Sequence, residues 1–220
     1  MTMPELHARL LADVIAIGAP YPLVLTGGYA VRAHRIVDRP SDDLDVATES
    51  PEPMEQIAHT VSAGLQQRGW RVAELEIAPL SARFTVTEPT TGEECEVDVL
   101  KEVFTKPVAH LSYGPVLAEE DVIGTKVRAL AERGAARDLI DVFAASRRWT
   151  TADFEEFGRR HARDRFDLED LHSRLEGAEW VDDAEFTAFG LDEAYISALR
   201  TFFQQWATEL GLRLAAPYDE

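Results

Sequence analysis

A short stretch near the N-terminus, residues 23–45, constrains the fold of this chain more than any other part of its sequence. It begins with the apolar run Leu23–Leu25, which predicts a buried strand. The pair Gly27-Gly28 then favours a tight turn into a helix with apolar periodicity, and a second predicted strand, Asp43–Val46, follows. This succession of strand, glycine turn, helix and strand indicates an α/β (α+β) domain.

The two aspartates of the second strand, Asp43 and Asp45, are the first candidate catalytic residues. Side chains alternate between the faces of a strand, so these two share a face and Asp42 points to the other. Neighbouring carboxylates repel unless a cation or a proton neutralises them, and Mg²⁺ prefers hard oxygen ligands. The Gly27-Gly28 turn allows the backbone to approach a phosphate closely. Together these features predict a site for a metal ion and a triphosphate, although alternate aspartates also occur at solvated strand ends.

Composition restricts the class of protein. The 220 residues suffice for one or two domains, and the 45% hydrophobic content is ample for a folded core. No apolar run approaches the length of about 18 residues that predicts a membrane helix, and the N-terminus lacks the pattern of a signal peptide. The single Cys95 excludes an internal disulfide and a cysteine-based zinc site. We therefore expect a cytoplasmic protein without a membrane partner.

The charge of the chain is strongly acidic, with 40 acidic and 22 basic residues and a net charge of −18. This balance argues against a broad nucleic-acid-binding surface. The distribution is uneven, because residues 125–165 have a net charge of +3 between acidic flanking segments. The basic run Arg159–Arg165 belongs to this segment and is either an acceptor-binding patch or a solvated helix face. Any contact with nucleic acid should be local and should weaken as the salt concentration rises.

Periodicity predicts the remaining elements. Helices are expected over residues 5–17, 120–133, 135–147, 167–175 and 192–210, and two more are expected to begin at Ser50-Pro51 and at the cap Thr150/Thr151. Strands are expected at residues 70–77, 82–87 and 94–100, and the last two should form a hairpin. We predict an α/β core over residues 1–110 and a helical domain over 111–220, with the boundary in the Pro- and Gly-containing segment 105–118.

Four ordered pieces of sequence carry a resemblance to a known family. They are Gly27-Gly28-x-Ala30, Ser41-x-Asp43-x-Asp45, Glu96-Val-Asp-Val99, and Lys126 with Arg133 and the run Arg137–Val142. The set resembles the nucleotidyltransferases of the DNA polymerase β superfamily. More closely, it resembles the AbiEii/AbiGii-type toxin family, which includes the MenT toxins. The resemblance covers roughly residues 20–145 and implies a polymerase β-like core with a mixed sheet flanked by helices.

The resemblance also implies catalytic roles. Asp43, Asp45 and Asp98 are expected to hold Mg²⁺ or Mn²⁺, and Asp98 is expected to accept the proton of the attacking hydroxyl. Glu96 alternates onto the same strand face as Asp98 and competes with it for the third position. Lys126 is expected to neutralise charge on the triphosphate.

Six residues are assigned to nucleotide binding, namely Gly27, Gly28, Ser41, Arg39, Lys126 and Asp138. Ser41 either donates a hydrogen bond to a phosphate oxygen or serves as a turn hydroxyl. Arg39 pairs with phosphate, with the carboxylate cluster, or in a surface ion pair.

Two further aspartates match the family pattern Arg-Asp-x-x-Asp. Asp138 is expected to orient Lys126 or Arg137, whereas Asp141, on the same helix face, reads as structural.

The function implied by the resemblance is transfer of a nucleotide from an NTP to an acceptor hydroxyl, with release of pyrophosphate. It further implies a toxin of a toxin–antitoxin pair that acts on the 3′ end of tRNA, with an antitoxin protein as partner. The same catalytic residues suit transfer to a small molecule, such as a cationic aminoglycoside, or to a protein hydroxyl. A non-catalytic nucleotide-binding module is a third interpretation, against which the intact carboxylate set argues.

Overall fold

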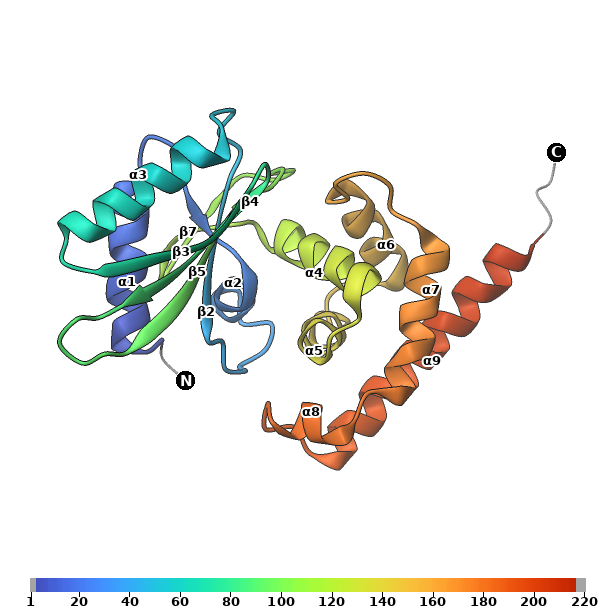
Figure 1. The fold of residues 1–220 in the computed structure, drawn as a ribbon. Helices are drawn as coiled ribbons and strands as arrows, with labels where there is room; N and C mark the ends of the chain where they lie inside the picture. Colours follow the sequence, from blue (N-terminus) through green and yellow to red (C-terminus); the bar gives the residue numbers. More distant parts are fainter. Residues whose placement is uncertain (1–2, 217–220) are drawn as a thin grey trace. The chain divides into compact units, whose positions relative to one another are not determined.

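The chain folds into two compact units, Met1–Glu119 and Glu120–Glu220, which we call the N-terminal and the C-terminal unit. The structure is a computed structural model that describes residues 3–216. A seven-stranded sheet with helices makes up the N-terminal unit, and helices make up the C-terminal unit (Figure 1). The predicted α/β class is therefore confirmed.

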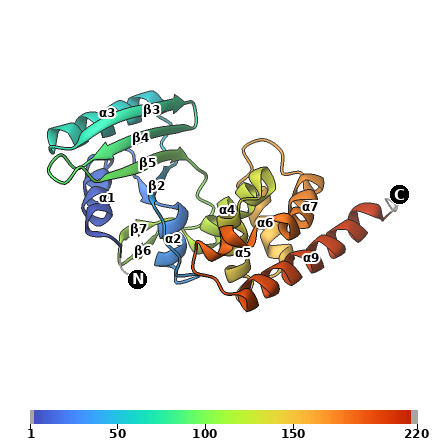
Figure 2. The ribbon, with the colours of Figure 1, turned by 60° about the horizontal axis from the view of Figure 1, so that its bottom comes forward.

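The N-terminal unit contains a mixed sheet with the strand order β3-β4-β5-β2-β1-β7-β6. The pairs β2/β5 and β1/β7 are parallel, and the other neighbouring strands are antiparallel. Helices α1 and α3 cover one face of the sheet, and α2 lies on the other side (Figures 1 and 2). The strands are β1 (Val24–Leu25), β2 (Asp43–Thr48), β3 (Arg71–Ala78), β4 (Ser81–Thr87), β5 (Glu94–Lys101), β6 (Ala109–Leu111) and β7 (Gly114–Val116); the helices are α1 (Glu5–Ile17), α2 (Gly27–Ala33) and α3 (Met54–Gln67).

The two faces of this sheet differ in chemistry because apolar and polar residues alternate along its central strands. Phe84 and Val86 of β4 and Val97 and Val99 of β5 are buried beneath the helices, which removes their side chains from water. The residues between them are polar or charged and point to the opposite face. One face of the sheet thus forms the core, and the other can carry a polar site.

Two parts of the N-terminal unit differ from the sequence expectation. Helix α3 begins at Met54, after Pro53, rather than at Ser50-Pro51, because the residue that precedes a proline is disfavoured in helical conformation. The segment placed at the domain boundary instead forms the hairpin β6–β7, and β7 joins the sheet beside β1 with Leu25 opposite Val116. The compact unit therefore extends to Glu119.

The C-terminal unit is built around aromatic side chains, with Phe154, Phe186, Phe203 and Trp206 fully buried. Local signals fix its helix ends; the Thr150 hydroxyl, for example, accepts the Asp153 N–H at 3.2 Å in a capping box. Within residues 3–216, no helix combines the length and apolar character needed to cross a membrane. The helices of the C-terminal unit are α4 (Glu119–Arg133), α5 (Ala136–Ala145), α6 (Thr151–Arg160), α7 (Leu168–Gly177), the 3₁₀ helix η1 (Ala178–Trp180), α8 (Asp183–Thr187) and α9 (Glu193–Ala215).

Candidate active site

The glycine turn at the start of α2 lies directly against the carboxylate of Asp45. Strand β1 ends at Leu25, and the next residue, Thr26, donates its N–H to the Asp45 carbonyl oxygen at 2.9 Å. Gly27 then adopts φ +62°, in the left-handed region that favours glycine. A Cβ at this position would stand 1.9 Å from Oδ2 of Asp45. The turn and the carboxylate can therefore approach this closely only because residue 27 has no side chain.

The segment that leads into β2 lies against the second glycine. A Cβ on Gly28 would stand 2.3 Å from Oγ of Ser41 and 3.5 Å from a guanidinium nitrogen of Arg39. The Ser41 hydroxyl makes only a long contact, 3.5 Å, with the Asp43 carbonyl oxygen. Arg39 is buried and donates to the Pro40 carbonyl oxygen at 2.9 Å. The glycine turn, Arg39 and Ser41 thus gather beside the start of β2.

A buried tyrosine forms a hydrogen bond with the segment that leads into β2. The Tyr29 hydroxyl, on α2, donates to the Ser41 carbonyl oxygen at 2.8 Å. Nδ1 of His7, on α1, lies 2.5 Å from the same hydroxyl. Burial raises the pKa of Tyr29 to about 12 and lowers the pKa of His7. Tyr29 and His7 lie 22 positions apart in the chain, so local sequence patterns do not predict their contact.

Four carboxylates share the polar face of the sheet. Parallel pairing of β2 with β5 sets Asp45 opposite Asp98 and Asp43 opposite Glu96. The side chain of Asp98 is 13% exposed and that of Glu96 is 32% exposed, so Asp98 is the more enclosed of the two candidates for the third position. Carboxylates on adjacent strands repel one another, so a nearby cation is needed to stabilise their charged forms.

Arg83 of β4 supplies that cation. It lies opposite Asp98 in the antiparallel β4/β5 register and donates from two nitrogens to its two oxygens, both at 2.7 Å. Its Nε also lies 3.2 Å from Glu96. The bidentate bond with Asp98 raises the pKa of Arg83 further above its ordinary value. The sequence reasoning missed this residue, although its position in the strand alternation, between buried Ala82 and Phe84, could have placed it on the polar face.

The donor set on the polar face has the chemistry of a divalent-cation site. Asp43, Asp45 and Asp98 offer hard oxygen ligands from one face of two adjacent strands. Across residues 3–216, no three carboxylate, His or Cys side chains stand close enough together to hold a metal ion in their present rotamers. Both oxygens of Asp98 are held by Arg83, and a rotation of this pair is what ligation would require. The residue types and their register fit Mg²⁺ or Mn²⁺, with Arg83 as the competing cation.

Lys126 and the paired aspartates form a buried cluster inside the C-terminal unit. The Lys126 side chain is 9% exposed, and its Nζ lies 3.1 Å from Asp141 and 3.7 Å from Asp138, both fully buried. Arg133 donates to both oxygens of Asp138, at 2.7 and 3.1 Å. Asp141, which the sequence treated as structural, is thus the nearer partner of Lys126, and Asp138 binds chiefly Arg133. The role of Lys126 toward a triphosphate stays a prediction.

The basic run Arg159–Arg165 is less available for a phosphate than its sequence indicates. Arg159 and Arg160 both pair with Glu156, the latter at 2.7 Å, and Arg165 lies 3.2 Å from Asp167. These exposed ion pairs are weak, so they can exchange for another anion. The run supports at most a local, salt-sensitive contact with nucleic acid.

Comparison with known proteins identifies a family. A family model described as nucleotidyl transferase AbiEii toxin, type IV TA system, matches residues 9–208. A search of curated proteins found no match.

Solved structures share the fold at low sequence identity. MenT4, a nucleotidyltransferase toxin from Mycobacterium tuberculosis H37Rv, aligns with a TM-score of 0.58 and 18% identity over 96% of this chain and 91% of its own. JHP933 from Helicobacter pylori aligns with a TM-score of 0.55 and 18% identity over 96% of both chains. At this identity the likeness concerns the fold, and it confirms the expected nucleotidyltransferase architecture.

Proposed function

Because this chain belongs to the AbiEii nucleotidyltransferase toxin family, we propose that it transfers a nucleotide from an NTP to an acceptor hydroxyl in a reaction that depends on Mg²⁺ or Mn²⁺. The observation that carries the proposal is the register of β2 with β5. It sets Asp45 opposite Asp98 on one face of the sheet, while the glycine turn lies against the carboxylate of Asp45. This is the arrangement needed to hold cations beside a triphosphate.

Each residue of the site has a proposed task. Asp43, Asp45 and Asp98 hold the divalent cation, which when bound neutralises the negative charge of the triphosphate. Gly27 and Gly28 leave room for phosphate oxygens next to the backbone. Ser41 and Arg39, beside the turn, donate hydrogen bonds to those oxygens.

The reaction follows from this arrangement. The acceptor oxygen forms a bond with the α-phosphorus, the bond between the α-phosphorus and the bridging oxygen breaks, and pyrophosphate leaves. Asp98 takes the proton of the attacking hydroxyl once Arg83 has released its carboxylate. Positioning and charge stabilisation do most of the catalytic work in phosphoryl-group chemistry, and the rigid strands provide both.

For the acceptor we propose the 3′ end of tRNA, and for the cell we propose a cytoplasmic toxin held in check by an antitoxin protein. Membership in the toxin family supports the role in a toxin–antitoxin pair. The basic run Arg159–Arg165 is the segment we assign to the tRNA, through exchange of its exposed ion pairs. A cationic small molecule is the second candidate, because four carboxylates face one side of the sheet.

The test is a labelling experiment on the purified protein. The protein is incubated with Mg²⁺ and each NTP in turn, labelled at the α-phosphate, together with total tRNA. The same reaction is run with Asp45→Asn and with Asp42→Asn, whose exposed side chain precedes β2 without sharing the polar face. We expect label in the tRNA with the wild type and Asp42→Asn, and a loss of at least about a hundredfold with Asp45→Asn.

The outcomes separate the candidate functions. A parallel reaction contains an aminoglycoside in place of tRNA, and label in the aminoglycoside but not in tRNA would replace the tRNA acceptor with a small molecule. Equal transfer by the wild type and Asp45→Asn would refute the assigned site. The same comparison with EDTA in place of Mg²⁺ tests the metal, because transfer that survives chelation contradicts its role.

A further inference from the structure

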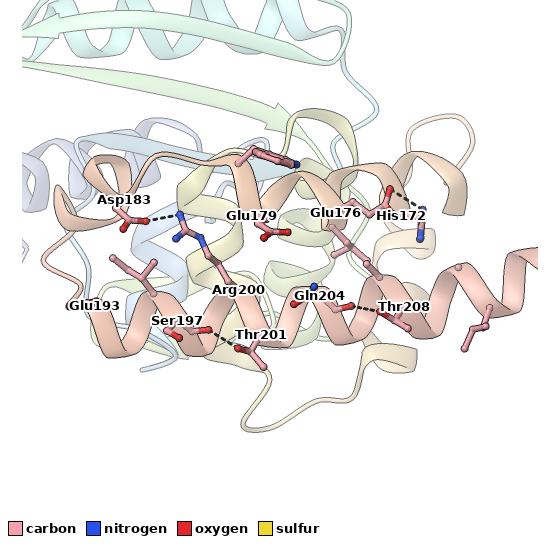
Figure 3. Close-up of a pocket in the computed structure, with 16 residues that line it drawn as sticks. His172, Glu176, Glu179, Asp183, Glu193, Ser197, Arg200, Thr201, Gln204 and Thr208 are labelled. Carbon is pink, nitrogen blue, oxygen red and sulfur yellow. Dashed lines mark hydrogen bonds and ion pairs between the residues drawn. The ribbon is translucent and has the colours of Figure 1, made fainter.

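The C-terminal unit contains a groove along one face of its longest helix. Helices α7, η1 and α8 form one wall and α9 forms the other, and the cavity between them has a volume of about 930 Å³ (Figure 3). Gly211 of α9 lies close to His172 of α7, since a Cβ on Gly211 would stand 2.8 Å from Nε2 of that histidine. None of the residues assigned to nucleotide transfer lines this groove. We refer to it as the acidic groove.

The rim of the acidic groove carries four carboxylates, from Glu176, Glu179, Asp183 and Glu193. Arg200 is the only arginine or lysine among the residues that line it. One nitrogen of its guanidinium lies 2.6 Å from Asp183 and donates to the Val181 carbonyl oxygen at 2.7 Å, whereas its Nε is buried and has no hydrogen-bond partner among residues 3–216. The groove therefore presents net negative charge, which disfavours nucleic acid and anionic lipid and favours a cationic partner.

Two hydroxyl groups of the groove are satisfied by the backbone of α9. The hydroxyl of Thr201 donates to the Ser197 carbonyl and that of Thr208 donates to the Gln204 carbonyl, each at 2.8 Å (Figure 3). These side chains thus have no unmet need for a small polar ligand. Asp183 pairs with Arg200, and Glu176 lies 3.7 Å from Nδ1 of His172. Both carboxylates are exposed, so these pairs can exchange for the cations of a partner, which would also neutralise Glu179 and Glu193.

Large apolar side chains are exposed at the same groove. Trp180 is 85% exposed and Leu212 is 70% exposed, and both belong to its lining. Leu175 and Ile196 are buried and form apolar parts of the walls. An exposed tryptophan beside an apolar wall, ringed by charge, is the composition of a protein-binding hot spot.

The length of the acidic groove corresponds to that of a helix of several turns. The lining residues of α9 run from Glu193 to Leu212, a rise of about 28 Å at 1.5 Å per residue. They recur at spacings of three and four and so follow one side of α9, where Ile196 and Ala207 are buried and the exposed residues are Glu193, Ser197, Thr201, Gln204, Thr208 and Leu212. The opposite face, with Phe203 and Leu210, is buried in the core. An amphipathic helix fills such a groove with an apolar stripe and leaves its flanks to the rim.

We propose that the acidic groove binds a basic amphipathic helix of a partner protein. Its apolar stripe covers Trp180 and Leu212, and its Lys or Arg side chains pair with Glu176 and Glu179. A second copy of this chain is disfavoured as the occupant, because each copy carries a net charge of −18. The inference concerns the C-terminal unit alone and does not depend on the proposed reaction.

The test uses a synthetic peptide and the full-length protein. The probe is a fluorescein-labelled peptide of about twenty residues, with leucines at helical spacings i, i+3, i+4 and i+7 and lysines elsewhere. A peptide of the same composition in scrambled order controls for charge alone. Fluorescence anisotropy should show the patterned peptide binding at least about tenfold more tightly than the scrambled one.

Groove variants decide where the peptide binds. Trp180→Ala and the double variant Glu176→Lys/Glu179→Lys should each weaken binding of the patterned peptide at least about tenfold. Glu209→Lys, at an exposed position of α9 outside the lining, should bind like the wild type. Circular dichroism of each variant checks that the fold is retained.

Three results would overturn the proposal. The first is equal affinity for the patterned and scrambled peptides, and the second is wild-type affinity of the groove variants. The third is self-association of the protein alone, measured by sedimentation, that Trp180→Ala abolishes, because it would make a second copy the occupant of the groove.

Discussion

Replacing Gly27 with alanine tests how the glycine turn supports Asp45. The alanine methyl carbon would stand 1.9 Å from Oδ2, 2.5 Å from Cγ and 2.7 Å from Cβ of Asp45, where ordinary van der Waals contact begins at 3.4 Å. To bring the methyl carbon and Oδ2 from 1.9 Å to 3.4 Å apart, the carboxylate or the turn must move by about 1.5 Å. A misplacement of about 1 Å in a reacting geometry can cost about a hundredfold in rate.

The same substitution also strains the backbone. At φ +62° an alanine in the left-handed region costs about 1–2 kcal/mol relative to glycine. Gly92→Ala is the matched control, because Gly92 has φ +76° and a Cβ there would meet nothing within 4 Å. The backbone cost is therefore shared by the two variants, and only Gly27→Ala displaces Asp45.

The assay combines stability with activity. Urea unfolding followed by circular dichroism should show both variants less stable than the wild type by about 1–2 kcal/mol, with a further loss for Gly27→Ala from the clash. Nucleotide transfer should stay near the wild-type rate for Gly92→Ala and fall about a hundredfold for Gly27→Ala. A Gly27→Ala protein that is folded and as active as Gly92→Ala would refute the idea that the turn holds Asp45 in its working position.

Three other substitutions probe the charged networks. Lys126→Met removes a cation that lies 3.1 Å from the fully buried carboxylate of Asp141, so urea denaturation should show a loss of about 3–5 kcal/mol, and a loss below about 1 kcal/mol would contradict the burial argument. Arg83→Gln removes the cation that competes for Asp98, so added Mg²⁺ should raise the melting temperature more than in the wild type, and an equal rise would count against this competition. Burial lowers the pKa of His7, so below about pH 6.5 the unfolded chain binds a proton that the folded chain does not, and stability falls as the pH decreases. In His7→Gln the loss of stability between about pH 7 and 5 should be smaller than in the wild type, and an unchanged pH profile would exclude His7 as its source.

Local pattern was enough to predict most elements of this fold. The alternation of Phe84 and Val86 and the turn before Gly92 predicted the β4–β5 hairpin, because strand period and turn chemistry are encoded within a few residues. The same period predicted that Asp43 and Asp45 share a face. Helix caps such as Thr150 likewise carry their signal locally.

Features that depend on distant segments could not be predicted in this way. The two-residue period of a strand predicts which face of the sheet Asp98 occupies. It does not predict that β5 pairs in parallel with β2, which sets Asp98 opposite Asp45. The bond between Arg83 and Asp98 depends on the register of the hairpin, and the contact of Tyr29 with His7 joins two helices. Strands β6 and β7 have three residues each, and periodicity cannot distinguish such short strands from a loop.

The parallel pairing of β2 with β5 has a consequence for the order in which this protein acquires activity. Asp45 and Asp98 are about fifty positions apart in the chain, and the segment between them contains a helix and two strands. Contacts of such high sequence separation form late, because closing a long loop costs entropy before the contact repays it. A nascent or partly folded chain therefore lacks the assembled carboxylates, and catalytic competence begins only when the central strands of the sheet have paired.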